Sequence, residues 1–183
     1  MHYFLSGEIL ALREQVQAIA AEVVLPAAEQ VDAQAAWPEA GMRALADARL
    51  TALTAPQRVG GHGQGLLALA ALTESLGRAC ASTAMCFGMH GVATAVIAAK
   101  ATDHHEEHYL RPIAEGRHLT TLALSEGGTG AHFFMPQTPL VLDGTPMWCA
   151  AASSSSPAAA MPTPTWCPPW PARRRTWATS AAW

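Results

Sequence analysis

The chain has 183 residues and half of them are hydrophobic, so it can bury a substantial core in one or two domains. Its 11 basic and 14 acidic residues give a formal net charge of -3, which argues against a nucleic-acid partner or an anionic membrane. The four cysteines form no C-x-x-C pair, and the first residues lack the basic and apolar regions of a signal peptide. We therefore expect a cytoplasmic protein without a metal site or a disulfide framework.

The first part of the chain has a helical pattern. Ser6 can cap a helix with Glu8 in its first turn, and one apolar stripe follows at spacings of three and four: Ile9, Leu12, Val16, Ile19 and Val23. Pro26 is expected to end or kink this helix. The Ala- and Gln-rich residues 27–36 favour helix, and Trp37-Pro38 should begin another helix that turns Met42 and Leu45 inward.

Residues 51–65 read as a connection that ends in a glycine-rich run, Gly60 to Gly65. The run superficially resembles a dinucleotide-binding fingerprint. However, no apolar strand leads into it and its spacing is not G-x-G-x-x-G, so we expect a mobile surface loop instead of a phosphate site.

Two further helices are predicted after this loop. Leu69, Leu72, Leu76 and Ala79 form one apolar stripe, and residues 82–100 are almost entirely apolar or small. The second segment is just long enough to span a membrane, but its small residues and His90 favour a helix buried in a bundle. We interpret His90 as a core or pocket-edge histidine.

A short polar helix should start at Asp103, with Glu106 completing a capping box. It carries His104 and His108 four residues apart, a spacing that could share a metal, but the order is not H-E-x-x-H and we expect a solvated polar face. Pro112 and Gly116 close the helical region. Four or five helices joined by short links predict a mainly α bundle.

The pattern changes at Thr120. Residues 120–125 alternate as a short strand, and three glycines then fall within the loop Ser125 to Gly130. Such a loop can offer backbone N–H groups to an anion or to a polar ring edge, while a plain hairpin or bulge turn is the alternative.

Six segments in this order resemble the acyl-CoA dehydrogenase family. The resemblance is collinear from about Leu12 to Gly144 and is carried by Leu12-Arg13-Glu14, Pro38 to Leu50, Gly60 to Gly63, Cys80 to Ala84, Tyr109 to Gly116, and Ser125 to Gly130. It implies a helical N-terminal domain at residues 1–117 and the start of a β-barrel middle domain at residues 118–145.

The resemblance also implies a chemistry. In this family a carboxylate removes the α-proton of an acyl thioester and a hydride passes to FAD. The residues expected to border the flavin are Leu122, Leu124, Ser125, Gly130 and Ala131. Gly127 replaces a family proline, and Ala131-His132 replaces a Ser-Asp pair, which leaves Ala131 as the candidate substrate contact. The family's catalytic carboxylate is expected in a C-terminal part that this chain lacks, so no catalytic residue is assigned.

Residues 146–183 have a different composition. They contain no Asp, Glu, Lys, Leu, Ile, Val, Phe, Tyr or Gly, and they hold five of the six tryptophans, so we expect a low-complexity disordered tail. The codons for residues 157–170, read one nucleotide earlier, permit the peptide TSGGHADAYVVSTV, which is similar to middle-domain strands of the family. This predicts a reading-frame shift.

These observations predict a truncated acyl-CoA dehydrogenase-like, FAD-dependent oxidoreductase of CH–CH bonds, inactive as this chain alone. The implied substrate is an acyl-CoA, and intact relatives commonly form homo-oligomers. A flavin-dependent monooxygenase of the same fold is one alternative. A small helical interaction module with a disordered tail is another.

Overall fold

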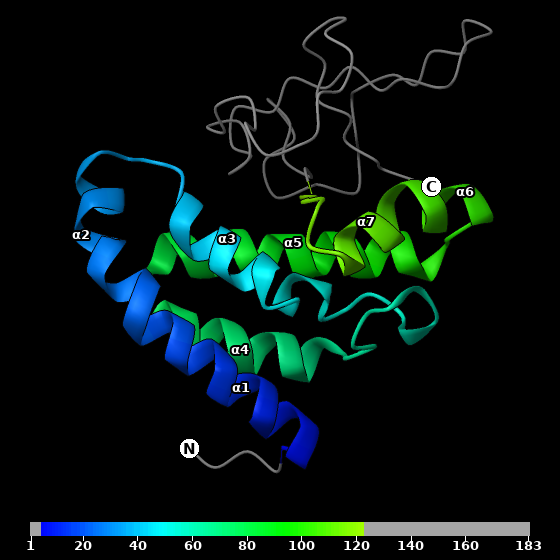
Figure 1. Cartoon of the computed structure of the whole chain (residues 1–183), viewed down its shortest axis with the longest axis horizontal. Helices are drawn as coiled ribbons and strands as arrows, with labels where there is room; N and C mark the ends of the chain where they lie inside the picture. Colours follow the sequence, from blue (N-terminus) through cyan, green and yellow to red (C-terminus); the bar gives the residue numbers. More distant parts are fainter. Residues whose placement is uncertain (1–4, 123–183) are drawn as a thin grey trace, which may run out of the picture.

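The computed structural model describes residues 5–122, which form a helical bundle (Figure 1). Its α-helices are α1 (Gly7–Ile19), α2 (Leu25–Ala33), α3 (Glu39–Asp47), α4 (Leu66–Gly77), α5 (Ala81–Ala99), α6 (Asp103–His105) and α7 (Arg111–Ala114). The expected mainly α fold is confirmed for this part of the chain. The predicted middle-domain stub beyond Leu122 and the predicted tail lie outside the described residues.

The first helix follows its predicted cap but changes register part-way. The Ser6 hydroxyl accepts the N–H of Ile9, and Glu8 lies in the first turn. A π-helical turn, Ala20–Val24, then joins α1 to α2 and adds a residue to the turn. The buried stripe therefore continues through Ala20 and Val24, whereas the predicted Ile19 and Val23 are only half-buried.

Pro26 does not end this helix, contrary to one of the two expectations. It lies in the first turn of α2, directly after the π turn, and the chain stays helical to Ala33. A proline has no N–H to donate, so a place next to the widened turn costs less than one inside regular α-helix. Helix α2 ends at Ala33, and Ala35, two residues further on, has a left-handed φ of 47°.

The main core lies between α1, α3, α4 and α5. Helix α4 packs against both α1 and α5, and Figure 1 shows it between them. The predicted inward residues Met42, Leu45, Leu69, Leu72 and Leu76 are all buried. A smaller apolar cluster lies under the C-terminal half of α5 and contains Ala55, Val59, Ile97, Leu110 and Ile113.

Helix α5 is the one helix among residues 5–122 that is long and apolar enough to cross a membrane by length and composition. In this structure α3, α4 and the π-helical turn Glu106–Leu110 pack against it. Its inner face carries buried Phe87, His90 and Ile97. This packing is that of a central bundle helix, as the sequence predicted.

The short helix α6 starts at Asp103 as predicted, but its cap is formed by other residues than expected. Thr102, not Asp103, caps α6: its hydroxyl accepts the His105 N–H, and the His105 ring accepts the Thr102 N–H. A histidine thus fills the place that we had expected Glu106 to take. The helical region ends at Gly116, whose φ is 69°.

Candidate functional site

The candidate site is the junction at which the chain leaves the helical bundle, and it is built around His90. This side chain lies midway along α5 and is only 2% exposed. Two other parts of the chain reach it: the connection after α3, at Thr51, and the exit segment, residues 117–122. The sequence interpretation of His90 as a core or pocket-edge histidine is confirmed.

Both ring nitrogens of His90 meet backbone groups. Nε2 lies 2.9 Å from the carbonyl oxygen of Thr51, so it must carry a proton and donate it. Nδ1 faces the backbone of Thr120 and lies 3.1 Å from its nitrogen and 3.3 Å from its carbonyl oxygen. In a neutral ring the single proton therefore lies on Nε2, where it is donated to Thr51, and Nδ1 accepts the Thr120 N–H.

Burial also favours the neutral ring. It lowers the pKa of His90 from its ordinary value of 6.5 to about 4, because a charged imidazole would lose its hydration there. The carbonyl oxygens of Thr51 and Thr120 act in the opposite direction, and nearby His118 adds a small lowering. The pKa of His118 is itself lowered by burial.

The connection after α3, which accepts the hydrogen bond from His90, is buried. Residues Thr51 to Ala55 are all buried, and the Thr54 hydroxyl donates to the carbonyl oxygen of Gly91 at 2.7 Å. The connection is therefore bonded to α5 at two successive residues, His90 and Gly91. This fixes the carbonyl of Thr51 relative to the helix.

The glycine-rich run Gly60 to Gly65 differs from the expected mobile surface loop. Backbone N–H groups of His62, Gly63 and Gln64 donate to carbonyl oxygens of residues 52, 55 and 53. A Cβ on Gly61 would lie 2.2 Å from the Ala55 oxygen, so the two backbones touch. These N–H groups are already bonded, which removes the donors that a phosphate would need.

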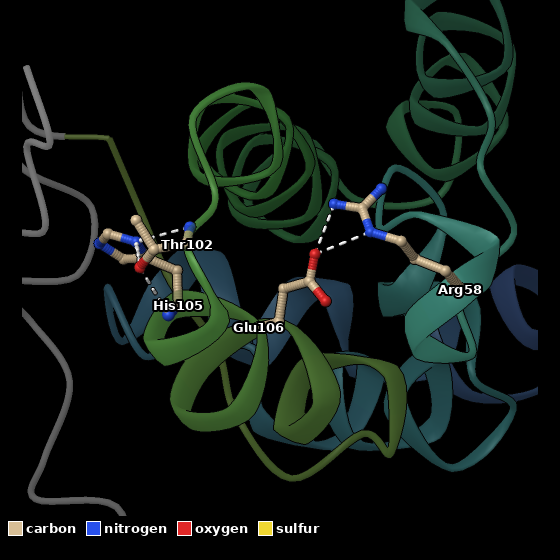
Figure 2. A network of polar contacts seen from close by, with 4 residues as sticks. All are labelled: Arg58, Thr102, His105 and Glu106. Atoms are coloured by element: carbon tan, nitrogen blue, oxygen red, sulfur yellow. Dashed lines mark hydrogen bonds and ion pairs between the residues drawn. The ribbon is translucent and has the colours of Figure 1, made fainter.

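An ion pair braces the same connection against the end of the bundle. Arg58 contacts Glu106 through Nε at 2.7 Å and through a terminal nitrogen at 2.6 Å, as Figure 2 shows. Figure 2 also shows Thr102 and His105, which cap the turn that carries Glu106. Arg58 is more than half exposed, so this brace contributes on the order of 1 kcal/mol or less.

His104 and His108 do lie together, with stacked rings whose centroids are 4.1 Å apart. His108 Nδ1 bonds to the carbonyl oxygen of His104 at 3.0 Å. Among residues 5–122, no group of three or more His, Cys, Asp or Glu side chains is placed to hold a metal. The pair lies on an exposed face, in agreement with the solvated polar surface that the sequence predicted.

The exit segment is held at successive residues. The Arg117 N–H donates to the Pro112 oxygen, the His118 ring packs edge-on against Tyr109, and Leu119 contacts the main core. Thr120 then bonds to His90. Residues 120–122 have no regular secondary structure, so the predicted strand is not present in its described part.

Of the predicted flavin-bordering residues, Leu122 lies in the described part of the chain and is half-buried. Leu124, Ser125, Gly130 and Ala131 lie outside the described residues, as does the substrate contact expected at Ala131. Next to Leu122 in the chain, the hydroxyl of Thr121 is buried and has no hydrogen-bond partner among residues 5–122, as is also true of the Thr51 and Thr73 hydroxyls. An apolar side chain next to a buried, unpaired hydroxyl suits the edge of a polar ring system.

Comparison with known proteins decides the family. The profile described as "Acyl-CoA dehydrogenase, N-terminal domain" matches residues 6–117, which is more than half of the chain. The chain belongs to the acyl-CoA dehydrogenase family. The matched range ends at Arg117, the first residue of the exit segment.

Individual relatives agree with this membership. Acryloyl-CoA reductase (NADH) of Anaerotignum propionicum is 27% identical over 143 residues, which cover 78% of this chain and 36% of the relative. The structure of a glutaryl-coenzyme A dehydrogenase glutaryl-CoA complex matches with a TM-score of 0.72 at 20% identity, covering 82% of this chain and 40% of that one. An FAD complex of PigA matches with a TM-score of 0.65 at 18% identity, covering 76% of this chain and 37% of that one.

The chain thus spans well under half the length of these relatives. The two structural matches, both under 25% identical, establish the shared fold of the helical part.

Sequence reasoning did not find the connection between His90, Thr51 and Thr120. The partners are 39 and 30 residues away in the chain, and both contribute backbone atoms, which carry no side-chain signature. The available signal was an isolated histidine on an apolar helix, which must bond to something when it is buried.

Proposed function

We propose that this chain supplies the N-terminal helical domain of an FAD-dependent oxidoreductase that acts on the CH–CH bond of an acyl-CoA. The observation that carries the proposal is the family match over residues 6–117, ending where the exit segment begins. A relative named for an acyl-CoA and a structural match that is an FAD complex support the substrate class and the cofactor.

The described residues fit a flavin edge at one point. Leu122 is half-buried and apolar, and the preceding residue, Thr121, has a buried hydroxyl without a partner among residues 5–122. FAD, when bound, would accept the hydride removed from the acyl chain. The contribution of these residues is to border the cofactor and exclude water, while the helices fix where the exit segment begins.

No group in residues 5–122 is assigned as the base that removes the α-proton. Buried His90 and half-buried His118 do not suit this role, because His90 has both ring nitrogens bonded to backbone groups and the ring of His118 packs against Tyr109. The proposal therefore leaves proton removal to a carboxylate outside the described residues.

A domain graft tests this function. Residues 6–122 of this chain would replace the matching segment of the glutaryl-CoA dehydrogenase whose structure it resembles. We expect the chimera to retain FAD and to oxidise an acyl-CoA with an artificial electron acceptor. A chimera that is folded by circular dichroism but colourless, beside a yellow parent enzyme, would refute the proposal.

A further inference from the structure

We propose that His90 is a positioning residue that fixes the direction in which the exit segment leaves the helical bundle and approaches the cofactor. The importance of that segment for a flavin rests on the proposed function. The contact itself does not, because it lies within the described residues.

The ring of His90 joins two backbones through one rigid group. Its Nε2–H donates to Thr51, which is itself buried and held on α5 by the neighbouring Thr54–Gly91 bond. Its Nδ1 accepts from Thr120 on the opposite edge of the ring. Because the Thr51 bond orients the ring, Nδ1 is directed at the backbone of Thr120, with the Thr120 nitrogen at 3.1 Å and its carbonyl oxygen at 3.3 Å.

The backbone of His90 is fixed within helix α5. The carbonyl oxygen of His90 accepts the hydroxyl of Thr94 at 2.8 Å, and both residues are buried. Phe87 and Ile97, one and two turns away on the same helix, are buried as well. The backbone that carries the ring is therefore part of the packed core.

The position of Thr120 restricts the position of Leu122, the residue predicted to border the cofactor. Leu122 is two residues further on, a reach of at most about 7 Å for an extended chain. Among the described contacts, the bond to His90 is the last hydrogen bond between the exit segment and the bundle before Leu122. A loss of this bond would free the chain immediately before the residues expected at the flavin.

An apolar residue at this position would remove the partner of a buried carbonyl at Thr51 and of a partly buried N–H at Thr120. The Thr51 carbonyl would lose its donor and the Thr120 N–H would lose its acceptor. A buried backbone group without a partner is strongly disfavoured, so the exit segment would move until water reached them. Glutamine carries one donor and one acceptor on a planar amide and is the closest substitute.

The test uses the full-length chain and needs no flavin. Long-range ¹H–¹⁵N spectra report the tautomer of His90, and hydrogen exchange reports protection of the Thr120 amide. We expect the Nε2–H tautomer, a protected Thr120 amide, and a fivefold to tenfold faster Thr120 exchange in His90→Leu, as expected for one lost hydrogen bond. His90→Gln should restore most of the protection.

A buried substitution on the same helix serves as the matched control. Phe87→Leu should lower the overall stability but leave Thr120 protected relative to the rest of the bundle. A proton on Nδ1 in the wild-type chain, or equal Thr120 exchange in wild type and His90→Leu, would overturn the proposal. If His90→Leu does not fold, the wild-type tautomer still decides the contact.

FAD affinity tests whether His90 also positions the exit segment for the cofactor. In the domain graft, His90→Leu should weaken FAD binding by a similar factor, while Phe87→Leu should not. A protected Thr120 amide with unchanged FAD affinity in His90→Leu would reject the positioning role. A graft that binds no FAD would instead refute the proposed function.

Discussion

Acidification should destabilise the bundle through His90. The folded chain holds this ring neutral with a pKa of about 4, whereas the unfolded chain protonates it near 6.5. Between these two values the unfolded state binds more protons, so stability falls as the pH falls. Above pH 6.5 the ring is neutral in both states and His90 protonation takes nothing from the free energy of unfolding. Below about pH 4 the ring is protonated in both states and no further stability is lost.

The size of this effect follows from the gap between the two pKa values. Each tenfold difference in proton affinity is worth about 1.4 kcal/mol, so the gap corresponds to about 3 kcal/mol of unfolding free energy. That is a large part of the 5–15 kcal/mol typical of a small domain. His118, whose pKa is also lowered by burial, should add to the loss in the same direction.

Urea unfolding at a series of pH values between 7 and 4 measures this loss. His90→Gln cannot titrate, so its stability should change less than that of the wild type over this range, with the difference near 3 kcal/mol. A second variant, His118→Gln, separates the contribution of the neighbouring histidine. Equal pH dependence in wild type and His90→Gln would refute the assignment of a buried neutral ring.

Three further predictions concern the backbone and the coding sequence. Gly61→Ala should destabilise the chain by about 2–4 kcal/mol in urea unfolding, because its Cβ would meet the Ala55 oxygen, whereas Gly65→Ala, with open space around it, should change stability by less than about 1 kcal/mol. Ala35→Gly should raise the thermal midpoint by relieving about 1 kcal/mol of strain at a left-handed φ, and an unchanged or lower midpoint would contradict this. The coding DNA should permit the TSGGHADAYVVSTV peptide one nucleotide before the frame of residues 157–170, and codons that forbid it would end the frame-shift hypothesis.

Local signals in the sequence were sufficient for most helices. The Ser6 cap, the inward residues of α3 and α4, and the closing Gly116 depend on the side chain or backbone freedom of single residues. The π turn before Pro26 was not predictable in this way. Tertiary packing, which the local sequence does not encode, determines whether such a turn forms. With this turn, Val24 is buried in place of the predicted Val23.

The connection after α3 shows why composition alone was misleading. Four glycines within Gly60 to Gly65 favoured a loop on the surface. In the structure their small size lets the backbone approach Ala55 and pair with buried carbonyl groups. Glycine is the typical residue both in a mobile loop and where two backbones touch. Only the tertiary structure shows which of the two applies.

The candidate site was likewise predictable only in part. The sequence predicted His90 as an inward histidine, which the structure confirms. It predicted Leu122 as a cofactor-edge residue through the family resemblance, and that role stays a prediction. The bonds to Thr51 and Thr120 depend on how three distant segments fold together, and no local pattern encodes them. The remaining predicted flavin contacts lie outside the described residues and stay predictions.

The dissociation constant of FAD in the domain graft, measured with and without His90, tests the central claim most directly. We expect the graft with the native histidine to bind FAD, His90→Leu to weaken binding fivefold to tenfold, and His90→Gln to restore it. A folded graft that binds no FAD would refute the proposed function, and equal FAD affinity in all three forms would refute the positioning role of His90.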